Sequence, residues 1–172
     1  MKLLYKESYA MMYEFMRPGE EAEVSRLVWS VFEEFEAAEY KQEGIDEFKR
    51  YIAPEFMAAR CAEGRFFVIC CRREDGIAGV IAVKENRHIS LLFVRREDQR
   101  KGIARRLLGM AIEACRAAEP KLEAVTVNSS RYAVGVYERL GFQSTGPEQE
   151  KNGIRFTPMR MAIGPQIPSS PP

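Results

Sequence analysis

The sequence is poor in the residues that bind metals or cross-link secreted folds. It contains one histidine, His88, and four cysteines, Cys61, Cys70, Cys71 and Cys115. Because no two of these cysteines have the CxxC spacing of a zinc site, we expect no bound metal. Cys70 and Cys71 adjoin within an apolar run, which is typical of buried thiols in a reducing compartment, and we therefore expect a cytoplasmic protein.

Long apolar runs and an excess of one charge are also missing. The apolar run from Ile77 to Val83 is far shorter than the roughly 20 residues that span a bilayer. Lys6 and Glu7 interrupt the first apolar residues, so we expect no secretory signal. Lys and Arg number 26 against 25 Asp and Glu, whereas nucleic-acid-binding domains carry a basic excess. We therefore expect neither a membrane nor a nucleic acid as a partner.

Two common phosphate-binding motifs are absent as well. The chain has no GxxxxGK followed by Ser or Thr, and its candidate turn holds the single glycine Gly102, where a dinucleotide fingerprint needs three. At 172 residues the chain is expected to form one domain with a substantial core. We place that domain at residues 11–163, between an N-terminal extension of residues 1–10 and a proline-rich tail of residues 164–172.

The hydrophobic pattern predicts strands and helices in a defined order. Strands are expected over Met11–Arg17, Arg65–Cys71, Ile77–Val83, Ile89–Val94, Leu122–Val127, Phe142–Thr145 and Ile154–Ile163. Helices are expected over Glu20–Glu36, over Ile45–Ala59 with a kink or early end at Pro54, from Ile103 to just before Pro120, and from Ser129 or Ser130 to Leu140. The polar segment 146–153 is expected to connect the last two strands.

The stretch from His88 to Ala118 organises the rest of the chain. It predicts a buried strand, then a basic turn, then an amphipathic helix that begins near Gly102. The free N–H groups and the dipole at a helix start attract anions, and glycine lets an anion approach the backbone. The pattern therefore indicates a phosphate site, with an ordinary helix start whose charges are solvated as the alternative.

Two motifs in this chain resemble those of the GCN5-related N-acetyltransferase (GNAT) family. Gln99-x-x-Gly102-x-Ala104 is similar to the family's pyrophosphate loop. Asn128, Ala133 and the string Tyr137-x-x-x-Gly-Phe are similar to a second conserved segment of the family. The resemblance covers about residues 13–163. It implies an α/β (α+β) acyl-CoA acyltransferase fold, with a mixed, mostly antiparallel central sheet flanked by helices.

The resemblance further implies that acetyl-coenzyme A is the cosubstrate. Its pantetheine arm would pair with the backbone of the strand before the loop, and its pyrophosphate would lie over the N–H groups of the loop. The residues implied to bind it are Leu92, Phe93, Val94, Gln99, Arg100, Lys101, Gly102, Ile103, Ala104, Arg105, Asn128 and Tyr137. For Arg105 a solvated helix face, and for Asn128 ordinary helix capping, are the alternatives.

For catalysis, the resemblance implies that Tyr137 is the general acid that protonates the departing thiolate. Its alternative is a core tyrosine. No Cys or Ser stands at the family's reactive position, so we expect direct attack by the acceptor in a ternary complex. The base is left open between His88, Glu33 or Glu34, and a water molecule. The oxyanion would be stabilised by the backbone N–H of Val94 or Phe93.

Acidic residues near the end of the first helix favour a positively charged acceptor. We therefore predict an N-acetyltransferase that transfers the acetyl group of acetyl-coenzyme A to a primary amine of a small cationic molecule. Two alternatives stay open, an acetyl-coenzyme A sensor without turnover and an acetyltransferase that acts on a protein. A homodimer is also left open.

Overall fold

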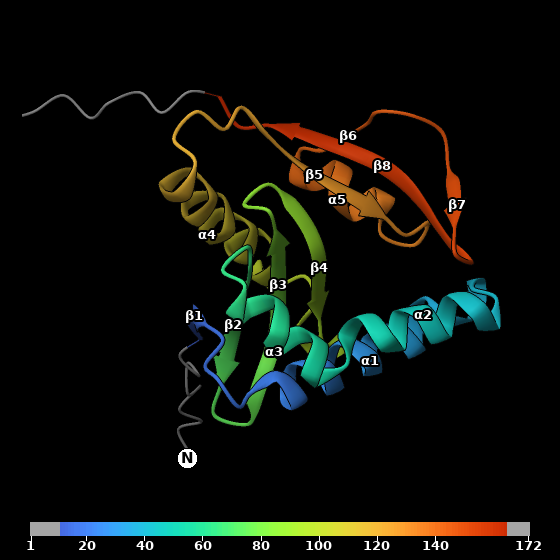
Figure 1. Cartoon of the computed structure of the whole chain (residues 1–172), viewed down its shortest axis with the longest axis horizontal. Helices are drawn as coiled ribbons and strands as arrows, with labels where there is room; N and C mark the ends of the chain where they lie inside the picture. The colour runs from blue at the N-terminus through green and yellow to red at the C-terminus, as the bar shows by residue number, and fades with distance from the viewer. Residues whose placement is uncertain (1–10, 165–172) are drawn as a thin grey trace, which may run out of the picture.

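The computed structural model describes residues 11–164, so the expectations for the N-terminal extension and for residues 165–172 lie outside the described part. One mixed sheet has the strand order β1-β2-β3-β4-β5-β8-β6, and β7 pairs with β8 (Figure 1). The strands are β1 (Met12–Phe15), β2 (Phe66–Arg73), β3 (Gly76–Lys84), β4 (His88–Val94), β5 (Ala124–Ser129), β6 (Gln143–Ser144), β7 (Gln149–Lys151) and β8 (Ile154–Ala162). The predicted fold class, a mostly antiparallel sheet flanked by helices, is confirmed.

Helices lie on both faces of β2, β3 and β4. They are α1 (Glu21–Phe35), α2 (Gln42–Ile52), α3 (Pro54–Ala62), α4 (Ile103–Ala118) and α5 (Val134–Leu140), with short 3-10 turns η1 (Ala37–Glu39) and η2 (Arg96–Asp98). Of these, α1 and α3 lie on one face and α4 on the other. α1 buries Val24, Val28 and Phe32 in one core, and α4 buries Leu107 and Ala111 in the other. These are the apolar faces that helical spacing predicts.

The helix expected over Ile45–Ala59, with a kink or early end at Pro54, is divided at that point into two helices. α2 ends at Ile52, Ala53 has extended backbone angles, and Pro54 is the first residue of α3. Proline disfavours the helical conformation in the residue before it and fits the first turn of a new helix. The break turns the chain, so that α2 and α3 follow different directions (Figure 1).

The polar segment 146–153 is more ordered than expected. It contains β7, which forms an antiparallel hairpin with β8 around Asn152 and Gly153. Both of these residues have positive φ, 52° and 74°. An Asn-Gly pair suits such a turn because it adopts positive φ at low cost. The hairpin meets α2 at Gly44.

The sheet splits between β4 and β5. These two strands run parallel, and their pairing comprises His88 with Thr126 and Ile89 with Val127. At the next residue the register between β3 and β4 shifts, leaving Ser90 without a partner on β3. A bulge of this kind bends a strand and increases its twist. Figure 1 shows β4 and β5 separating toward the side where α2 and β7 lie.

The same bulge changes which face of the sheet the β4 side chains occupy. Ile89 packs in the core beneath α4, whereas Leu91 and Phe93 pack in the core beneath α1. Without an extra residue, positions two apart would share one face. Past the bulge, the β4 edge that faces β5 has no strand paired with it from Ser90 to Val94 within the described chain.

Candidate active site

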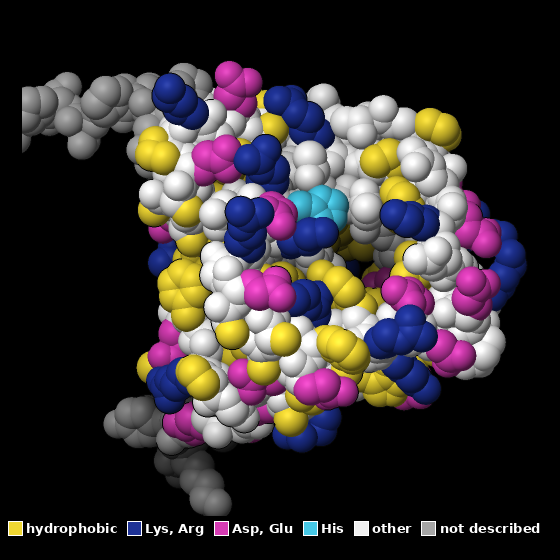
Figure 2. Space-filling model, viewed as in Figure 1, with side chains coloured by type: hydrophobic (Ala, Val, Ile, Leu, Met, Phe, Trp, Pro, Cys, Tyr) yellow, Lys and Arg dark blue, Asp and Glu magenta, His cyan; other side chains and the backbone are white. Residues whose placement is uncertain are grey.

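A cavity of about 300 Å³ opens where β4 and β5 separate. Figure 2 shows the molecule hollowed on this face. Apolar and aromatic side chains make up much of the wall, and a few titratable groups stand among them. The wall includes Phe32, Glu36, Tyr40, Glu47, Phe48, Tyr51, Lys84, His88, Leu92, Phe93, Asn128, Ser130 and Tyr137. A largely apolar pocket with a few convergent polar groups is the usual form of a small-molecule site.

Tyr137 lies in the wall of this cavity, on α5. It is 6% exposed and its ring meets Phe142 edge to face at 5.3 Å. Burial, together with the negative charge of Glu36, raises the pKa of the Tyr137 phenol above its usual value. The hydroxyl therefore stays protonated at neutral pH, as a proton donor must.

Glu36 faces the same cavity and was not among the bases predicted from the sequence. It follows the last residue of α1, and its side chain is partly buried. Burial raises the pKa of Glu36 to about 7, although a hydrogen bond with the Ser130 hydroxyl opposes this rise; the charge of Glu39 adds to it. The helical periodicity of α1 already indicates that Glu36 lies on the buried face. Val24, Val28 and Phe32 recur every four residues on the buried face of α1, and Glu36 is the next position of that stripe.

Glu33 and Glu34 lie elsewhere. Both are exposed, Glu33 is not in the cavity wall, and Glu34 forms an ion pair with Arg96 at 2.5 Å. One residue of a helix turns the side chain by about 100°, so Glu33 points away from the direction of Phe32. The structure therefore does not bring Glu33 to Tyr137.

His88 is in the cavity wall, at the point where β4 and β5 are still paired. Its Nδ1 lies 2.9 Å from the Thr126 hydroxyl. Burial, and then the nearby charge of Lys84, lower the pKa of His88. The imidazole is therefore neutral at pH 7 and tied to β5.

The residues implied to bind acetyl-coenzyme A fall in two groups. Leu92, Phe93, Asn128 and Tyr137 line the cavity. Val94, Gln99, Arg100, Lys101, Gly102, Ile103, Ala104 and Arg105 lie along the end of β4 and the start of α4. The two groups adjoin, since Leu92 and Phe93 precede Val94 on the same strand.

The start of α4 leaves room for a ligand to approach the backbone closely. Gly102 precedes the helix with φ 83°, and no atom outside its neighbours lies within 4 Å of the point where a Cβ would stand. Arg100 also has a positive φ of 62°. The Gln99 amide donates a hydrogen bond to the Val94 carbonyl at 3.1 Å, which fixes the turn against β4. Positive φ values beside a helix start are typical of turns whose backbone N–H groups bind anions.

A buried carboxylate anchors this turn from within. Asp98 is fully buried and bonds to Arg73, Arg95 and Lys101, the last at 2.9 Å. Burial opposes its charge, but these three cations outweigh burial and lower the pKa of Asp98 to about 2. Asp98 thereby balances part of the positive charge of the turn. Arg105 is exposed, and its guanidinium donates to the Arg139 carbonyl at the end of α5, 3.2 Å away.

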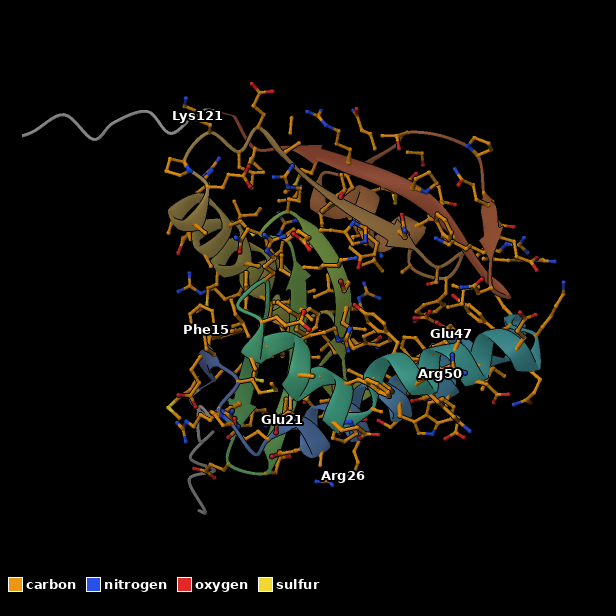
Figure 3. All side chains as sticks on the ribbon, viewed as in Figure 1. Phe15, Glu21, Arg26, Glu47, Arg50 and Lys121 are labelled. Carbon is orange, nitrogen blue, oxygen red and sulfur yellow. The ribbon has the colours of Figure 1, made fainter. Side chains whose placement is uncertain are left out.

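The β7–β8 hairpin closes the other side of the cavity by touching α2. A Cβ placed on Gly44 of α2 would lie 2.3 Å from the carbonyl oxygen of Gly153, so the two backbones are in contact. Lys41 pairs with Glu150 at 3.1 Å, and the Tyr40 hydroxyl donates to the Arg155 carbonyl at 3.5 Å. A second hollow of about 210 Å³ under the hairpin shares Tyr40, Glu47, Asn128 and Ile154 with the first. Glu47 and Arg50 are labelled on α2 in Figure 3.

Within residues 11–164 no group of three or more His, Cys, Asp or Glu side chains is arranged to hold a metal ion. No helix in this part of the chain is long and apolar enough to cross a membrane.

Comparison with known proteins agrees with the geometry. A family model described as an acetyltransferase (GNAT) domain matches residues 36–163. The GCN5-related N-acetyltransferase of Rhodopseudomonas palustris superposes with a TM-score of 0.74, at 17% identity over 88% of this chain and 95% of that one. The PaiA N-acetyltransferase of Thermoplasma acidophilum, solved with coenzyme A, also gives 0.74, at 14% identity over 90% and 99%.

Two further relatives differ in coverage. The spermidine N-acetyltransferase of Vibrio cholerae, solved with CoA and spermine, gives a TM-score of 0.60, at 17% identity over 88% of this chain and 95% of that one. The curated UPF0157 protein YqkA of Bacillus subtilis is 35% identical over 86 residues, which are 48% of this chain. That match spans 25% of YqkA, so the chain corresponds to about a quarter of its length.

Proposed function

The chain belongs to the GNAT family of acetyltransferases, and from this we propose that it transfers the acetyl group of acetyl-coenzyme A to a primary amine of a small cationic molecule. One observation carries the proposal. The free edge of β4 leads from the side of the turn at Gly102 into the cavity that holds Tyr137. A thioester bound along this edge would have its phosphates at one end and its reacting carbon at the other.

The residues at the start of α4 fit the phosphates of acetyl-coenzyme A. Gly102 leaves space for an anion against the backbone, and Arg100 and Arg105 are exposed beside it. The backbone of Leu92, Phe93 and Val94 has no partner strand on the β5 side and can pair with the amides of the pantetheine arm. Two of the structures that share this fold were solved with coenzyme A, which supports the assignment.

Tyr137 would act as the general acid. When the acceptor amine attacks the thioester carbonyl, the carbon–sulfur bond breaks and leaves a thiolate. A phenol held protonated beside it can supply the proton. A backbone N–H of Phe93 or Val94 would stabilise the oxyanion that forms during attack. The acceptor would attack directly, since no cysteine of the described residues lines this cavity and the Ser130 hydroxyl is engaged with Glu36 and the Ala133 N–H.

The shape of the acceptor side favours a small molecule over a protein. The contact of Gly44 with Gly153 and the pairing of Lys41 with Glu150 join α2 to the hairpin across the groove. A polypeptide would have to separate these elements to lie along the cavity. Glu36 and Glu47 give the wall two carboxylates, and the rings of Phe32, Tyr40 and Phe48 lie close by, as a cationic ligand prefers.

The test is thiol release from acetyl-coenzyme A with a panel of polyamines, aminoglycosides, amino acids, neutral amines and peptides. We expect turnover with cationic small amines and little with peptides of the same charge. Tight binding of acetyl-coenzyme A without thiol release from any acceptor would instead make the protein a sensor. Preference for a peptide would show that the hairpin opens and that the acceptor class is wrong.

A further inference from the structure

The acceptor amine is protonated at neutral pH and must lose a proton before it can attack. We infer that the Glu36 carboxylate takes this proton, and that the Ser130 hydroxyl positions it. This inference rests on the proposed function. It concerns a residue outside both motifs that link the chain to its family, so neither motif assigns the role.

Three elements bring Glu36, Ser130 and Tyr137 to one cavity. Glu36 stands where α1 ends and the η1 turn begins, which points its side chain inward from the acceptor side. Ser130 follows β5; its hydroxyl bonds with Glu36 and accepts the Ala133 N–H at 3.2 Å. Tyr137 lies on α5, near enough for the charge of Glu36 to affect its titration. An acid and a base that serve one reaction have to face the same space, and Glu36 and Tyr137 both line this cavity.

The other charged groups of the wall suit the role less well. Glu47 is held by Arg50 at 2.6 Å. The Nδ1 of His88 is tied to Thr126, at the junction of β4 and β5 rather than beside α5. Lys84 has the wrong charge for a base that meets a cation. Glu36 has no ion pair among the described residues, and its partner is a neutral hydroxyl.

Its environment also gives Glu36 the affinity for a proton that the step needs. The titratable groups near it are Glu39 and Tyr40 beside η1, Glu47 on α2, Lys84 and His88 on the sheet, and Tyr137 on α5. Burial and the charge of Glu39 raise the pKa of Glu36 to about 7, against the hydrogen bond from Ser130. A base works best when its pKa lies near the working pH.

One turnover involves four proton transfers. Glu36 takes one proton from the ammonium, and the neutral amine attacks the thioester carbonyl. The carbon–sulfur bond then breaks, and the thiolate takes the Tyr137 proton. The amide nitrogen gives its excess proton to the tyrosinate, directly or through water, which restores Tyr137. Glu36 releases its own proton to solvent, so that one acetyl group moves and one net proton leaves.

The deciding experiment compares two acceptors in the wild type and in Glu36→Gln. One is the best alkylamine from the thiol-release screen, and the other is its fluorinated analogue, whose amine is already neutral near pH 7. For the alkylamine we expect Glu36→Gln to lower kcat/KM by about 10²-fold or more. For the analogue the loss should be several-fold at most, because no base is needed. The affinity for acetyl-coenzyme A, measured by calorimetry, should stay unchanged.

The pH profile gives a second readout. In the wild type, kcat/KM for the alkylamine should rise with pH up to about 7 as Glu36 loses its proton, and then level off. Glu36→Asp should keep part of this profile, and Ser130→Ala should shift the rise to higher pH because its hydrogen bond lowers the pKa of Glu36. Glu113→Gln on the exposed face of α4 is the surface control.

Two results would overturn the inference. One is an equal loss for both acceptors in Glu36→Gln, which would make Glu36 a group that only binds or supports structure. The other is normal turnover in Glu36→Gln together with a large loss in Glu33→Gln or in His88→Gln. If instead the wild type releases no thiol with any amine, the proposed function itself fails.

Discussion

The two sides of the split between β4 and β5 are built in opposite ways. The donor side, from β4 to the start of α4, is made of backbone and comes from one continuous stretch, residues 88–105. The acceptor side is made of side chains, from the end of α1, from α2, from the Ser130 turn and from the β7–β8 hairpin. The first carries exposed arginines and the second carries carboxylates. A site that binds a large anion and a small cation needs basic residues on one side of the reacting bond and acidic residues on the other.

The largest effect that we expect is the loss of acetyl-coenzyme A binding on the donor side. Gly102→Glu places a side chain and a negative charge where the pyrophosphate should lie, at a φ that only glycine adopts easily. The affinity for acetyl-coenzyme A, measured by calorimetry, should fall by roughly 100-fold or more.

Gly109→Glu is the matched control for that variant. It adds the same residue to the same helix, at an exposed position with open space around it. If a folded Gly102→Glu protein bound acetyl-coenzyme A as tightly as the Gly109→Glu protein does, the anion site would have to lie elsewhere.

The second largest effect should come from removing the proposed general acid, Tyr137. Tyr137→Phe should lower kcat by about 10²-fold while leaving the affinity for acetyl-coenzyme A in place. Tyr132→Phe, at an exposed ring stacked on Phe35, should behave as wild type. A tyrosine with only a packing role would show the reverse pattern, a lower melting temperature with near-normal turnover.

Glu36, on the acceptor side, should make the stability of the protein depend on pH. Folding raises the pKa of Glu36 from the ordinary 4.5 to about 7, so the folded state binds this proton more tightly than the unfolded one. Its contribution to stability is therefore complete below pH 4.5 and is lost as the pH rises through 7. At pH 8, Glu36→Gln should have a free energy of unfolding up to about 3 kcal/mol higher than that of wild type, and a higher melting temperature. At pH 5 this difference in stability should be smaller. A gain that is the same at both values would contradict the raised pKa.

The smallest effect concerns the closure of the acceptor side. Gly44→Ala would press a methyl group against the Gly153 carbonyl and push the hairpin off α2, at a cost of about 1–3 kcal/mol. The KM of the acceptor should rise several-fold while that of acetyl-coenzyme A stays constant. Gly109→Ala, another helical glycine but with open space, should stabilise the protein by up to about 1 kcal/mol. Equal behaviour of the two variants would show that the hairpin contact is unimportant.

The same contrast explains what the sequence could and could not predict. The donor side depends on local order, so the turn at Gly102 and the helix behind it were predicted from a few adjacent residues. The acceptor side depends on where distant segments meet. Helical period alone could place Glu36 on the buried stripe of α1, but not across from Ser130 and Tyr137. The bulge at Ser90 left no local mark, because the residues on both sides of it are equally apolar.

The hairpin contact has a consequence for how the chain folds. Lys41 and Glu150 are separated by 109 positions in the sequence, and Tyr40 and Arg155 by 115. Closing so long a loop costs more conformational entropy than the short-range pairing that joins β2, β3 and β4. During synthesis, the residues of the donor side leave the ribosome well before the hairpin does. A growing chain thus contains α1, α2, β4 and the turn at Gly102 before the hairpin that closes the acceptor side has been made.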